Sequence, residues 1–537
     1  MGRARRVVML VVTLLAGLLP AMAAAQDNPS ARPFTYLIRN GTIVDGTGAP
    51  AFRGDIAIAG DRVVRVSTAP LDMSQAQHVI DASGLIVAPG FIDSHAHVES
   101  LDEHPLAENF LRQGVTTVWY APDGAMPWPL APAMQRLERV GHAPNIAFFA
   151  GHNTIRREVM GSANRAPTAT ELAQMEAMVA QAMEEGAIGL STGLRYVPGI
   201  YSETEEVIAL AKVAARYGGF YSSHIRDESA GSMASVREVI RIAEEAGLPG
   251  VVSHHKLMGQ PQWGQSVNTL AIIDSARARG VDVMLDQYPY DATSTNTSVL
   301  FPAWSLSGGN DSLRVRLADP VLRDSIIAGM RQTIIEERGG GDLARIRIAR
   351  YSRNPAWNGK TFADIAAERG SAPDMDFAVE LAIEIQTNGG AGGVWHVVDE
   401  ADVRRIMQHP WTMISSDGGI LIPGVGHPHP RGNGAFARVL GRYVREHGVL
   451  TLEDAIRKMT TLPAWRMNDE TRGRIAEGMV ADIAIFDAER IIDRATYEAP
   501  HQYADGMVHV LVNGTPVLSD GALTEARPGR VLRRAPE

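Results

Sequence analysis

The chain has 537 residues, of which 45% are hydrophobic and 21% charged, and its formal net charge is −10. This length favours one large domain with a smaller one, and the composition excludes a disordered chain. The negative charge and the lack of a basic stripe argue against nucleic acid as a partner. The sequence contains no cysteine, which excludes disulfides and thiolate metal ligands.

Residues 1–25 read as a cleavable secretory signal peptide. Three arginines precede an apolar run at residues 7–19, and small residues at 21–25 offer a cleavage zone. The apolar run is short for a transmembrane helix, with an uncleaved anchor as the alternative. We therefore expect a periplasmic or secreted protein that has no stable membrane span once the signal is removed.

The two ends of the chain are predicted to form one small β-sandwich, built from residues 34–88 and 471–537. Short strand-like runs lie at 36–44, 55–58 and 63–66 and are separated by glycine-containing turns. Similar runs lie at 482–486 and 508–512, and the last of them ends at the turn signal Asn513-Gly514. The long middle, residues 89–470, is then a separate domain.

The middle of the chain alternates helix and strand. Capping-box patterns at Thr168, Ser202 and Ser235 are expected to open three helices, which precede apolar strands at 187–190, 220–223 and 251–253. Further strands are expected at 86–92, 115–120, 145–149, 281–285 and 412–415. Eight such strands predict an α/β fold, a (β/α)8 TIM-like barrel with its active site at the carboxyl ends of the strands. Residues 300–390 exceed a normal βα loop and contain glycine-rich breaks, so we expect them to form a lid insertion.

Polar residues with metal-binding side chains follow these predicted strands. They are His95 and His97 after the first strand, Asp123 after the second, His224 after the fifth, His254 after the sixth and Asp417 after the eighth. The two histidines of the first strand point the same way because residues i and i+2 share a face. Any one of these residues alone reads as an ordinary polar side chain. Gathered at one rim, imidazole and carboxylate together predict a site for Zn²⁺ or a similar divalent ion.

Several motifs spread over nearly the whole mature chain carry a family resemblance. They are PGFIDSHAH at 89–97, GVTTV at 114–118, LSTGL at 190–194, SHIRDE at 223–228, SHHK at 253–256, YPY at 288–290, SSDG at 415–418 and GRIAEGMVAD at 473–482. With these motifs the chain resembles the amidohydrolase superfamily and, within it, the D-aminoacylases, which are N-acyl-D-amino-acid deacylases.

The resemblance implies a role for each residue that matches a motif. His224 and His254 would bind a tightly held zinc ion, and His95 and His97 would line a second, weaker metal site. Asp417 would be the general base that activates water.

The resemblance also implies a binding site for the substrate. Lys256, Tyr288 and Ser294 lie where the family binds the α-carboxylate of its substrate. For Ser294, an ordinary polar residue of a loop is the alternative.

The chain departs from its relatives at two positions. D-aminoacylases place a cysteine after the GVTTV strand, and here Asp123 falls at that position, where a plain turn residue before Gly124 is the alternative. A carboxylate still binds divalent metals but is a harder ligand than a thiolate. Strand four contains no lysine, which disfavours the carboxylated-lysine pattern of hydantoinases and dihydroorotases.

The function predicted on this basis is zinc-dependent hydrolysis of N-acyl-D-amino acids to a D-amino acid and a carboxylate. The alternatives are an L-Xaa-D-Xaa dipeptidase, another amidohydrolase, or an inactive binding protein on the same scaffold. The retained histidines and Asp417 disfavour the last of these. The expected partner is a small molecule, and the sequence leaves the acyl group, the D-side chain and the oligomeric state open.

Overall fold

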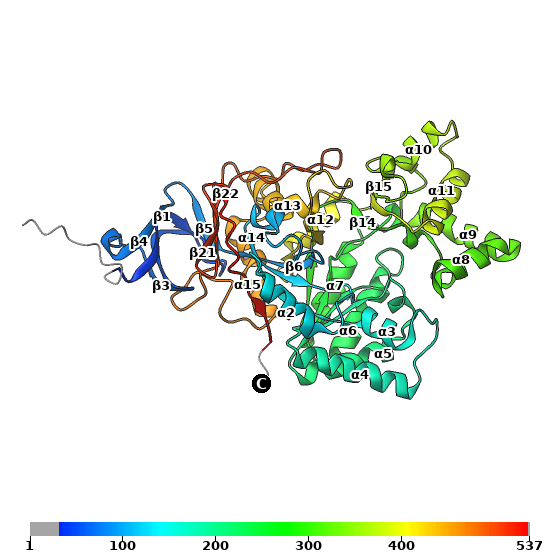
Figure 1. Cartoon of the computed structure of the whole chain (residues 1–537), viewed down its shortest axis with the longest axis horizontal. Coiled ribbons are helices and arrows are strands. Elements are labelled where there is room, and N and C mark those ends of the chain that lie inside the picture. Colours follow the sequence, from blue (N-terminus) through cyan, green and yellow to red (C-terminus); the bar gives the residue numbers. More distant parts are fainter. Residues whose placement is uncertain (1–31, 535–537) are drawn as a thin grey trace, which may run out of the picture.

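The computed structural model describes residues 32–534 and has an α/β fold of the TIM-barrel type (Figure 1). The predicted signal peptide lies outside the described residues. Among the described helices, none is long and apolar enough to cross a membrane.

The parallel strands of the central domain lie in two sheets. One sheet contains β6 (Phe91–His97), β7 (Val115–Tyr120) and β8 (Asn145–Phe148), and the other contains β10 (Gly189–Gly193), β11 (Phe220–His224), β12 (Gly250–Val252), β13 (Val283–Gln287) and β17 (Thr412–Ile414). Three short strands extend the sheets: β9 (Ala150–Gly151) beside β10, β18 (Gly418–Gly419) beside β6 and β23 (Val531–Leu532) beside β8. Hydrogen bonds link the sheets on both sides, from Ile188 N to Phe148 O (2.8 Å) and from Ser416 N to an Asp93 carboxylate oxygen (2.9 Å). Seven of the strands predicted for this domain are present. The bounds predicted for the first strand, 86–92, are wrong, because residues 86–89 form β5 in the sheet of the chain ends and the first strand of this domain is β6.

Aromatic side chains fill the space between these two sheets. The ring centroids of Trp119 and Phe220 lie 5.4 Å apart, and Phe149 lies 5.2 Å from Phe220 in an edge-to-face arrangement. All three side chains are fully buried. Adjacent strands also approach closely, since a Cβ at Gly189 would lie only 2.1 Å from the backbone oxygen of Phe220. The strands therefore enclose a packed core rather than a channel.

Helices cover the parallel strands from outside. They include α2 (Leu130–Val140), α3 (His152–Met160), α4 (Ala169–Glu184), α5 (Thr204–Arg216), α6 (Ser232–Ala246), α7 (Ser266–Ala278), α12 (Glu400–Gln408), α14 (Leu452–Met459) and α15 (Thr461–Arg466). The capping box predicted at Thr168 is confirmed, because its hydroxyl accepts from Glu171 N. The boxes predicted at Ser202 and Ser235 are wrong. Ser202 uses its hydroxyl on Gly199 O, and Ser235 lies inside α6, where its hydroxyl accepts from Asp227 N.

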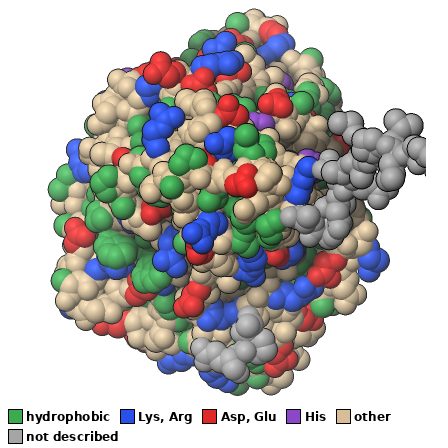
Figure 2. All heavy atoms as spheres, turned by 90° about the vertical axis from the view of Figure 1, so that its left-hand side faces the viewer, with side chains coloured by type: hydrophobic (Ala, Val, Ile, Leu, Met, Phe, Trp, Pro, Cys, Tyr) green, Lys and Arg blue, Asp and Glu red, His purple; other side chains and the backbone are tan. Residues whose placement is uncertain are grey.

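Both ends of the chain contribute to one nine-stranded sheet. Its strands are β1 (Phe34–Ile43), β2 (Phe52–Ala59), β3 (Arg62–Ser67), β4 (Ala76–Asp81), β5 (Ile86–Pro89), β19 (Ile483–Phe486), β20 (Met507–Val512), β21 (Thr515–Ser519) and β22 (Ala522–Leu523). The N- and C-terminal segments meet where β5 pairs antiparallel with β19. The predicted turn at Asn513-Gly514 is confirmed, since both residues have positive φ angles of 48° and 77° between β20 and β21. Acidic and basic side chains are interspersed on the face shown in Figure 2.

An insertion after β13 forms a separate small layer at the opposite end of the molecule from the nine-stranded sheet (Figure 1). It contains an antiparallel sheet of β14 (Thr293–Asn296), β16 (Gly392–Trp395) and β15 (Ile346–Arg350), with helices α8 (Gly309–Ala318), α9 (Pro320–Glu336), α10 (Phe362–Glu368) and α11 (Met375–Thr387). Asp319 caps α9 ahead of Pro320, a combination that favours a helix start. Residues of this insertion line the main cavity described below.

Candidate metal centre

The residues predicted to bind metal come together at the carboxyl ends of the parallel strands. His95 and His97 end β6, and His224 ends β11. Asp123 Oδ1 lies 3.4 Å from His95 Nε2, 3.7 Å from His224 Nδ1 and 3.5 Å from His254 Nε2. The strands therefore deliver side chains that are remote in sequence to one place.

Asp417 reaches the same centre from the eighth parallel strand. The short strand β18 pairs with the end of β6, which brings Asp417 next to the first two histidines. Asp417 Oδ1 lies 3.1 Å from His97 Nε2 and 3.6 Å from His95 Nε2. Its second oxygen, Oδ2, accepts a hydrogen bond of 2.6 Å from Arg431, which begins α13 (Arg431–Arg438).

These side chains form two overlapping ligand groups that share Asp123. One group consists of His95, His97, Asp123 and Asp417, and the other of Asp123, His224 and His254. Within each group the potential ligand atoms all lie within 4.8 Å of one another. The two groups thus meet at the Asp123 carboxylate.

Unpaired atoms in the centre fit the chemistry of a divalent metal. His95 Nε2, Asp123 Oδ1 and His224 Nδ1 are fully buried, and none of them has a hydrogen-bond partner among residues 32–534. Buried polar atoms are almost always paired in folded proteins. Three of them facing one point, as imidazole nitrogen and carboxylate oxygen, suit Zn²⁺ or a similar ion.

The nitrogen of each ring that faces away from the centre lies near a carboxylate. Glu228 lies next to two imidazole rings, with Oε1 3.2 Å from His254 Nδ1 and Oε2 3.6 Å from His224 Nε2. Asp286 lies 3.8 Å from His95 Nδ1, and Glu99 lies 3.5 Å from His97 Nδ1. Outer carboxylates of this kind fix the orientation and protonation of histidines that bind metals.

The electrostatics of the centre are dominated by negative charge. Burial acts to raise the pKa of Asp123, but the surrounding His95, His224 and His254 hold it well below its usual range. Burial and Lys256 act to lower the pKa of His254, yet carboxylates including Glu228 raise it to about 9. A bound divalent cation would balance this excess of carboxylate.

Asp417 is held in its ionised form. Burial acts to raise its pKa, but the Arg431 guanidinium and His95 keep the pKa well below the usual range. With Oδ2 held by Arg431, the other oxygen of this ionised carboxylate faces His97 and His95 in the centre.

The backbone is strained at two of these residues. His254 and Asp417 have φ angles of 34° and 48°, in the left-handed region that non-glycine residues rarely adopt. Hydrogen bonds hold both conformations, from His254 N to an Asp286 oxygen (2.9 Å) and from Asp417 N to His95 O (2.8 Å). Strain of this kind is concentrated at functional sites.

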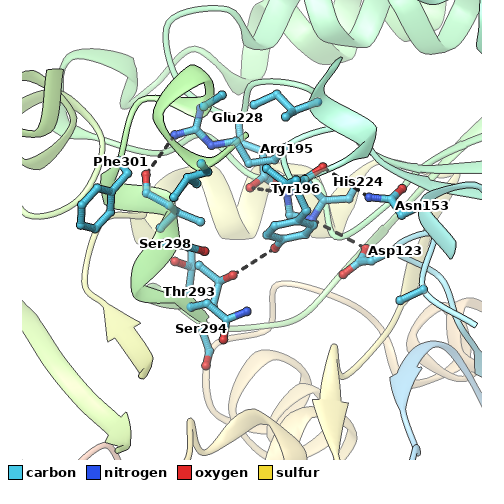
Figure 3. A pocket seen from close by; sticks show the side chains of 18 of the residues that line it. Asp123, Asn153, Arg195, Tyr196, His224, Glu228, Thr293, Ser294, Ser298 and Phe301 are labelled. Atoms are coloured by element: carbon cyan, nitrogen blue, oxygen red, sulfur yellow. Dashed lines mark hydrogen bonds and ion pairs between the residues drawn. The ribbon is translucent and has the colours of Figure 1, made fainter. Parts of the chain in front are cut away.

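A cavity of about 650 Å³ opens onto the centre. Asp123 and His224 lie on one side of it, across from Ser298 and Phe301 of the insertion (Figure 3). Such a volume suits a small-molecule ligand.

The three residues predicted to bind a carboxylate all line this cavity. Tyr288 has a buried hydroxyl that lacks a hydrogen-bond partner within the described part of the chain, and burial raises its pKa well above the usual value, so it remains a donor. Ser294 lies on β14, the strand of the insertion that borders the cavity. Lys256 is 6% exposed and is already engaged, because Nζ pairs with Glu228 and lies 2.9 Å from His254 Nδ1 and 3.0 Å from His254 O.

Sequence reasoning did not assign Glu228, Asp286, Glu99 or Arg431. Glu228 follows His224 by four residues within a motif used for the resemblance, and this spacing was a usable signal. Asp286 and Arg431 meet their partners only through strand pairing and the path of the chain after β18, which no local pattern reveals.

A family model described as the amidohydrolase family matches residues 78–297 and 354–518. The chain belongs to this family. The model leaves residues 298–353, which include α8 and α9, unmatched.

Curated relatives match over nearly the full length. The chain is 39% identical to N-acyl-D-glutamate deacylase and 37% identical to D-aminoacylase, both of Alcaligenes xylosoxydans xylosoxydans. The first match covers 93% of this chain and 96% of the relative, and the second covers 94% and 98%.

Solved structures agree with these relatives. N-acyl-D-glutamate deacylase from Bordetella bronchiseptica, complexed with zinc and a phosphonate inhibitor that mimics the tetrahedral intermediate, is 36% identical with a TM-score of 0.80. The match covers 93% of this chain and 99% of that one. A D-aminoacylase with a binuclear metal centre is 35% identical to this chain, with a TM-score of 0.79. That match covers 93% of this chain and all of the D-aminoacylase chain. The family resemblance predicted from the sequence motifs is confirmed.

Proposed function

We propose that this protein is a zinc-dependent amidohydrolase that cleaves N-acyl-D-amino acids to a D-amino acid and a carboxylate. The observation that carries the proposal is the pair of ligand groups that share Asp123 beside an ionised Asp417. Relatives at 35–39% identity over nearly the whole chain include N-acyl-D-glutamate deacylase and D-aminoacylase, which supports the same reading.

In this proposal the tight zinc site consists of Asp123, His224 and His254, and a second, weaker site adds His95 and His97. Glu228 orients His224 and His254 through their outer nitrogens. When bound, zinc lowers the pKa of a water molecule and polarises the scissile carbonyl.

Asp417 is the proposed general base. It accepts a proton from the attacking water at Oδ1 and delivers that proton to the nitrogen of the leaving amine, as one carboxylate within hydrogen-bond reach can do. Arg431 holds Oδ2 and so fixes the direction of Oδ1 toward the centre. Tyr288 and Ser294, with Lys256 beside them, are the proposed contacts of the substrate carboxylate.

The acidic residues on the cavity wall favour a deacylase over a dipeptidase. A dipeptide carries a free amine, which requires a carboxylate that is not already paired. The acidic lining residues are Asp123, Glu228 and Asp417, and each is engaged by histidine, lysine or arginine among the described residues. An N-acyl group has no charge at this position and needs no such partner.

The test is a hydrolysis screen of N-acetyl-D-amino acids, their L-enantiomers and L-Xaa-D-Xaa dipeptides with metal-loaded protein. We expect turnover of the D-series, loss of turnover after chelation, and recovery with zinc. Turnover confined to the dipeptides would replace the deacylase assignment with the alternative.

We further propose a domain division for the whole chain. Residues 34–88 and 471–537 form a β-sandwich, residues 89–470 form a closed (β/α)8 barrel, and residues 300–390 form its lid. The pairing of β5 with β19 and the insertion residues on the cavity wall support this division. Limited proteolysis tests it, with early cuts expected inside 300–390.

Residues 1–25 are proposed to be a cleaved signal peptide of a periplasmic or secreted protein. The support is the arginine-rich start followed by a short apolar run. Cell fractionation with N-terminal sequencing of the mature protein tests this proposal, and retention in the cytoplasm with an intact N-terminus would contradict it.

A further inference from the structure

A second cavity, of about 260 Å³, lies against the metal centre. It shares four lining residues with the main cavity, namely His97, Ser294, Asp417 and Arg431. Two of these belong to the centre itself, since His97 Nε2 lies 3.1 Å from Asp417 Oδ1. The centre therefore has open space on two sides, and both spaces reach the same pair of side chains.

The walls of the second cavity come from the loop at residues 420–430 and from β15 of the insertion. The loop follows β18, which pairs with the end of β6, and it is followed by Arg431 at the start of α13. A hydrogen bond of 2.7 Å from His427 N to Ala349 O joins the loop to β15. The loop is thus attached at both ends and in its middle, so the cavity is a built part of the fold.

The lining that belongs to the second cavity alone is mainly aliphatic. Besides four glycines, it includes Ala349, Ile420, Leu421, Ile422, Val425 and Pro428. The ring of His427 already contacts Tyr497 O at 2.7 Å, and the ring of His429 contacts Ala292 O at 3.1 Å. Arg350, the remaining residue of this lining, is exposed to solvent. The cavity therefore suits an uncharged aliphatic group.

The chemistry of the proposed reaction decides which part of a substrate this cavity receives. An N-acyl-amino acid extends in two directions from its amide, toward the charged amino-acid half and toward the acyl half. Lys256 and Tyr288, proposed above to contact the carboxylate, line the main cavity, and neither of them lines the second. With the amino-acid half in the main cavity, the acyl half is directed toward the aliphatic one.

The second cavity is larger than an acetyl group requires. A methyl group is close in size to a water molecule, which takes up about 30 Å³ in the liquid. It would fill only a small part of the 260 Å³. Ile422 and Val425 of the lining are also 40% and 42% exposed. A longer acyl chain would cover this aliphatic surface, and its removal from water favours binding.

We propose that the second cavity binds the acyl group of the substrate and selects for unbranched aliphatic chains longer than acetyl. At about 30 Å³ for each carbon atom, chains of about four to eight carbons match its volume. This inference rests on the proposed function and adds the class of acyl group that the protein accepts.

Gly419 offers a way to fill the cavity without changing its walls. It lines the second cavity, and its φ angle is not in the positive range that favours glycine. Apart from its chain neighbours, the only atom within 4 Å of a Cβ at this position would be His97 O, at 3.3 Å. Leucine would therefore occupy the cavity, whereas alanine would make the same contact with His97 O and leave most of the space free.

The test compares kcat/KM for N-hexanoyl-D-leucine and for N-acetyl-D-leucine on the same enzyme preparation. Wild type should prefer the hexanoyl substrate by about tenfold or more, because each methylene group removed from water contributes about fourfold. Gly419→Leu should abolish this preference, and Gly419→Ala should keep most of it. Since each preference compares two substrates on one sample, inactive protein in a preparation leaves the ratio unchanged.

The exposed part of the lining provides an independent test. Ile422→Asp places a charge among aliphatic side chains and should lower kcat/KM for the hexanoyl substrate while leaving the acetyl substrate unchanged. Val315→Asp is the matched control, because Val315 is 72% exposed on α8 and lines neither cavity. Equal kcat/KM for the two substrates in wild type would overturn the proposal. So would a preference that survives in Gly419→Leu, because the acyl chain would then lie in the main cavity.

A binding measurement separates this inference from the proposed function. Hydroxamates bind divalent metals through two oxygen atoms, and hexanohydroxamate and acetohydroxamate carry an acyl chain but no amino-acid half. If metal-loaded wild type hydrolyses no N-acyl-D-amino acid, the proposed function fails, but calorimetry with these two compounds still tests the cavity. Tighter binding of hexanohydroxamate that is lost in Gly419→Leu supports the aliphatic site. Equal affinities in wild type, or a difference that Gly419→Leu leaves intact, overturn it.

Discussion

Glu228 Oε1 lies 3.2 Å from His254 Nδ1, on the side of the ring opposite the nitrogen that faces Asp123. The same carboxylate faces His224 and pairs with Lys256. One buried acidic side chain therefore connects two rings of the proposed tight metal position to the lysine next to the cavity.

Glu228→Gln should weaken zinc binding by about 10–100-fold, the usual effect of losing an outer carboxylate. The amide keeps the shape of the side chain but no longer carries the charge that stabilises both imidazoles. Competition with a chromophoric chelator measures the affinity. Unchanged zinc affinity in this variant would show that the carboxylate does not support the ligands.

The same substitution should lower the free energy of unfolding by about 3–5 kcal/mol, since it leaves Lys256 buried without its partner. The double variant Glu228→Gln/Lys256→Met removes the unmatched charge. It should recover most of the stability in urea unfolding while its zinc affinity stays low. Recovery of zinc affinity in the double variant would instead mean that Glu228 acts only by neutralising Lys256.

Asp123→Ala should lower zinc content and activity together, because the carboxylate belongs to both ligand groups. Asp123→Cys should restore zinc binding under reducing conditions, since thiolate is a strong zinc donor. Elemental analysis and kcat/KM measure the two effects. Asp311→Ala, at a side chain that is 95% exposed, serves as the control. Wild-type zinc content and rate in Asp123→Ala would show that Asp123 is a turn residue and not a metal ligand.

Asp417→Asn should reduce kcat by about 10²–10⁴-fold, because the amide cannot accept the proton of the attacking water. Zinc content should remain close to that of wild type, since the other ligands are intact. Turnover and elemental analysis on the same sample separate the two effects. A variant that keeps more than about a tenth of the wild-type rate would assign the base to another residue.

Gly189→Ala should destabilise the central domain by about 1–3 kcal/mol, because the added Cβ meets the backbone of β11, which cannot rotate away. Gly392→Ala is the matched control in strand β16, where the nearest atom to a Cβ is 3.8 Å away. Urea unfolding compares the two variants. Equal stability of both would show that β10 and β11 separate at little cost.

The sequence predicts which side chains meet at the centre because local patterns place them. Each of these side chains follows an apolar strand, and parallel strands end at one rim, so His95, Asp123 and His224 converge without knowledge of the packing. A local pattern also predicted the capping box at Thr168. It failed at Ser235, where the hydroxyl bonds a preceding loop and the helix begins one turn earlier.

Other parts of the site depend on contacts that no local pattern encodes. Asp286 and Arg431 meet their partners only after distant segments pair. Arg338 appears in the sequence as one charged residue before a run of three glycines. Its burial without an ion pair to any carboxylate of residues 32–534 is a property of the folded insertion.

Because β5 pairs with β19, this part of the sheet forms only after nearly the whole chain has been synthesised. Ile56, Ile58 and Val87 pack against Ile483 and Ile485 in one apolar cluster. The first three leave the ribosome long before the last two, so their apolar face stays uncovered through most of synthesis. Contacts this distant along the chain form slowly and expose the intermediate to aggregation. Holding chaperones and slower expression should therefore reduce aggregation of the incompletely folded chain.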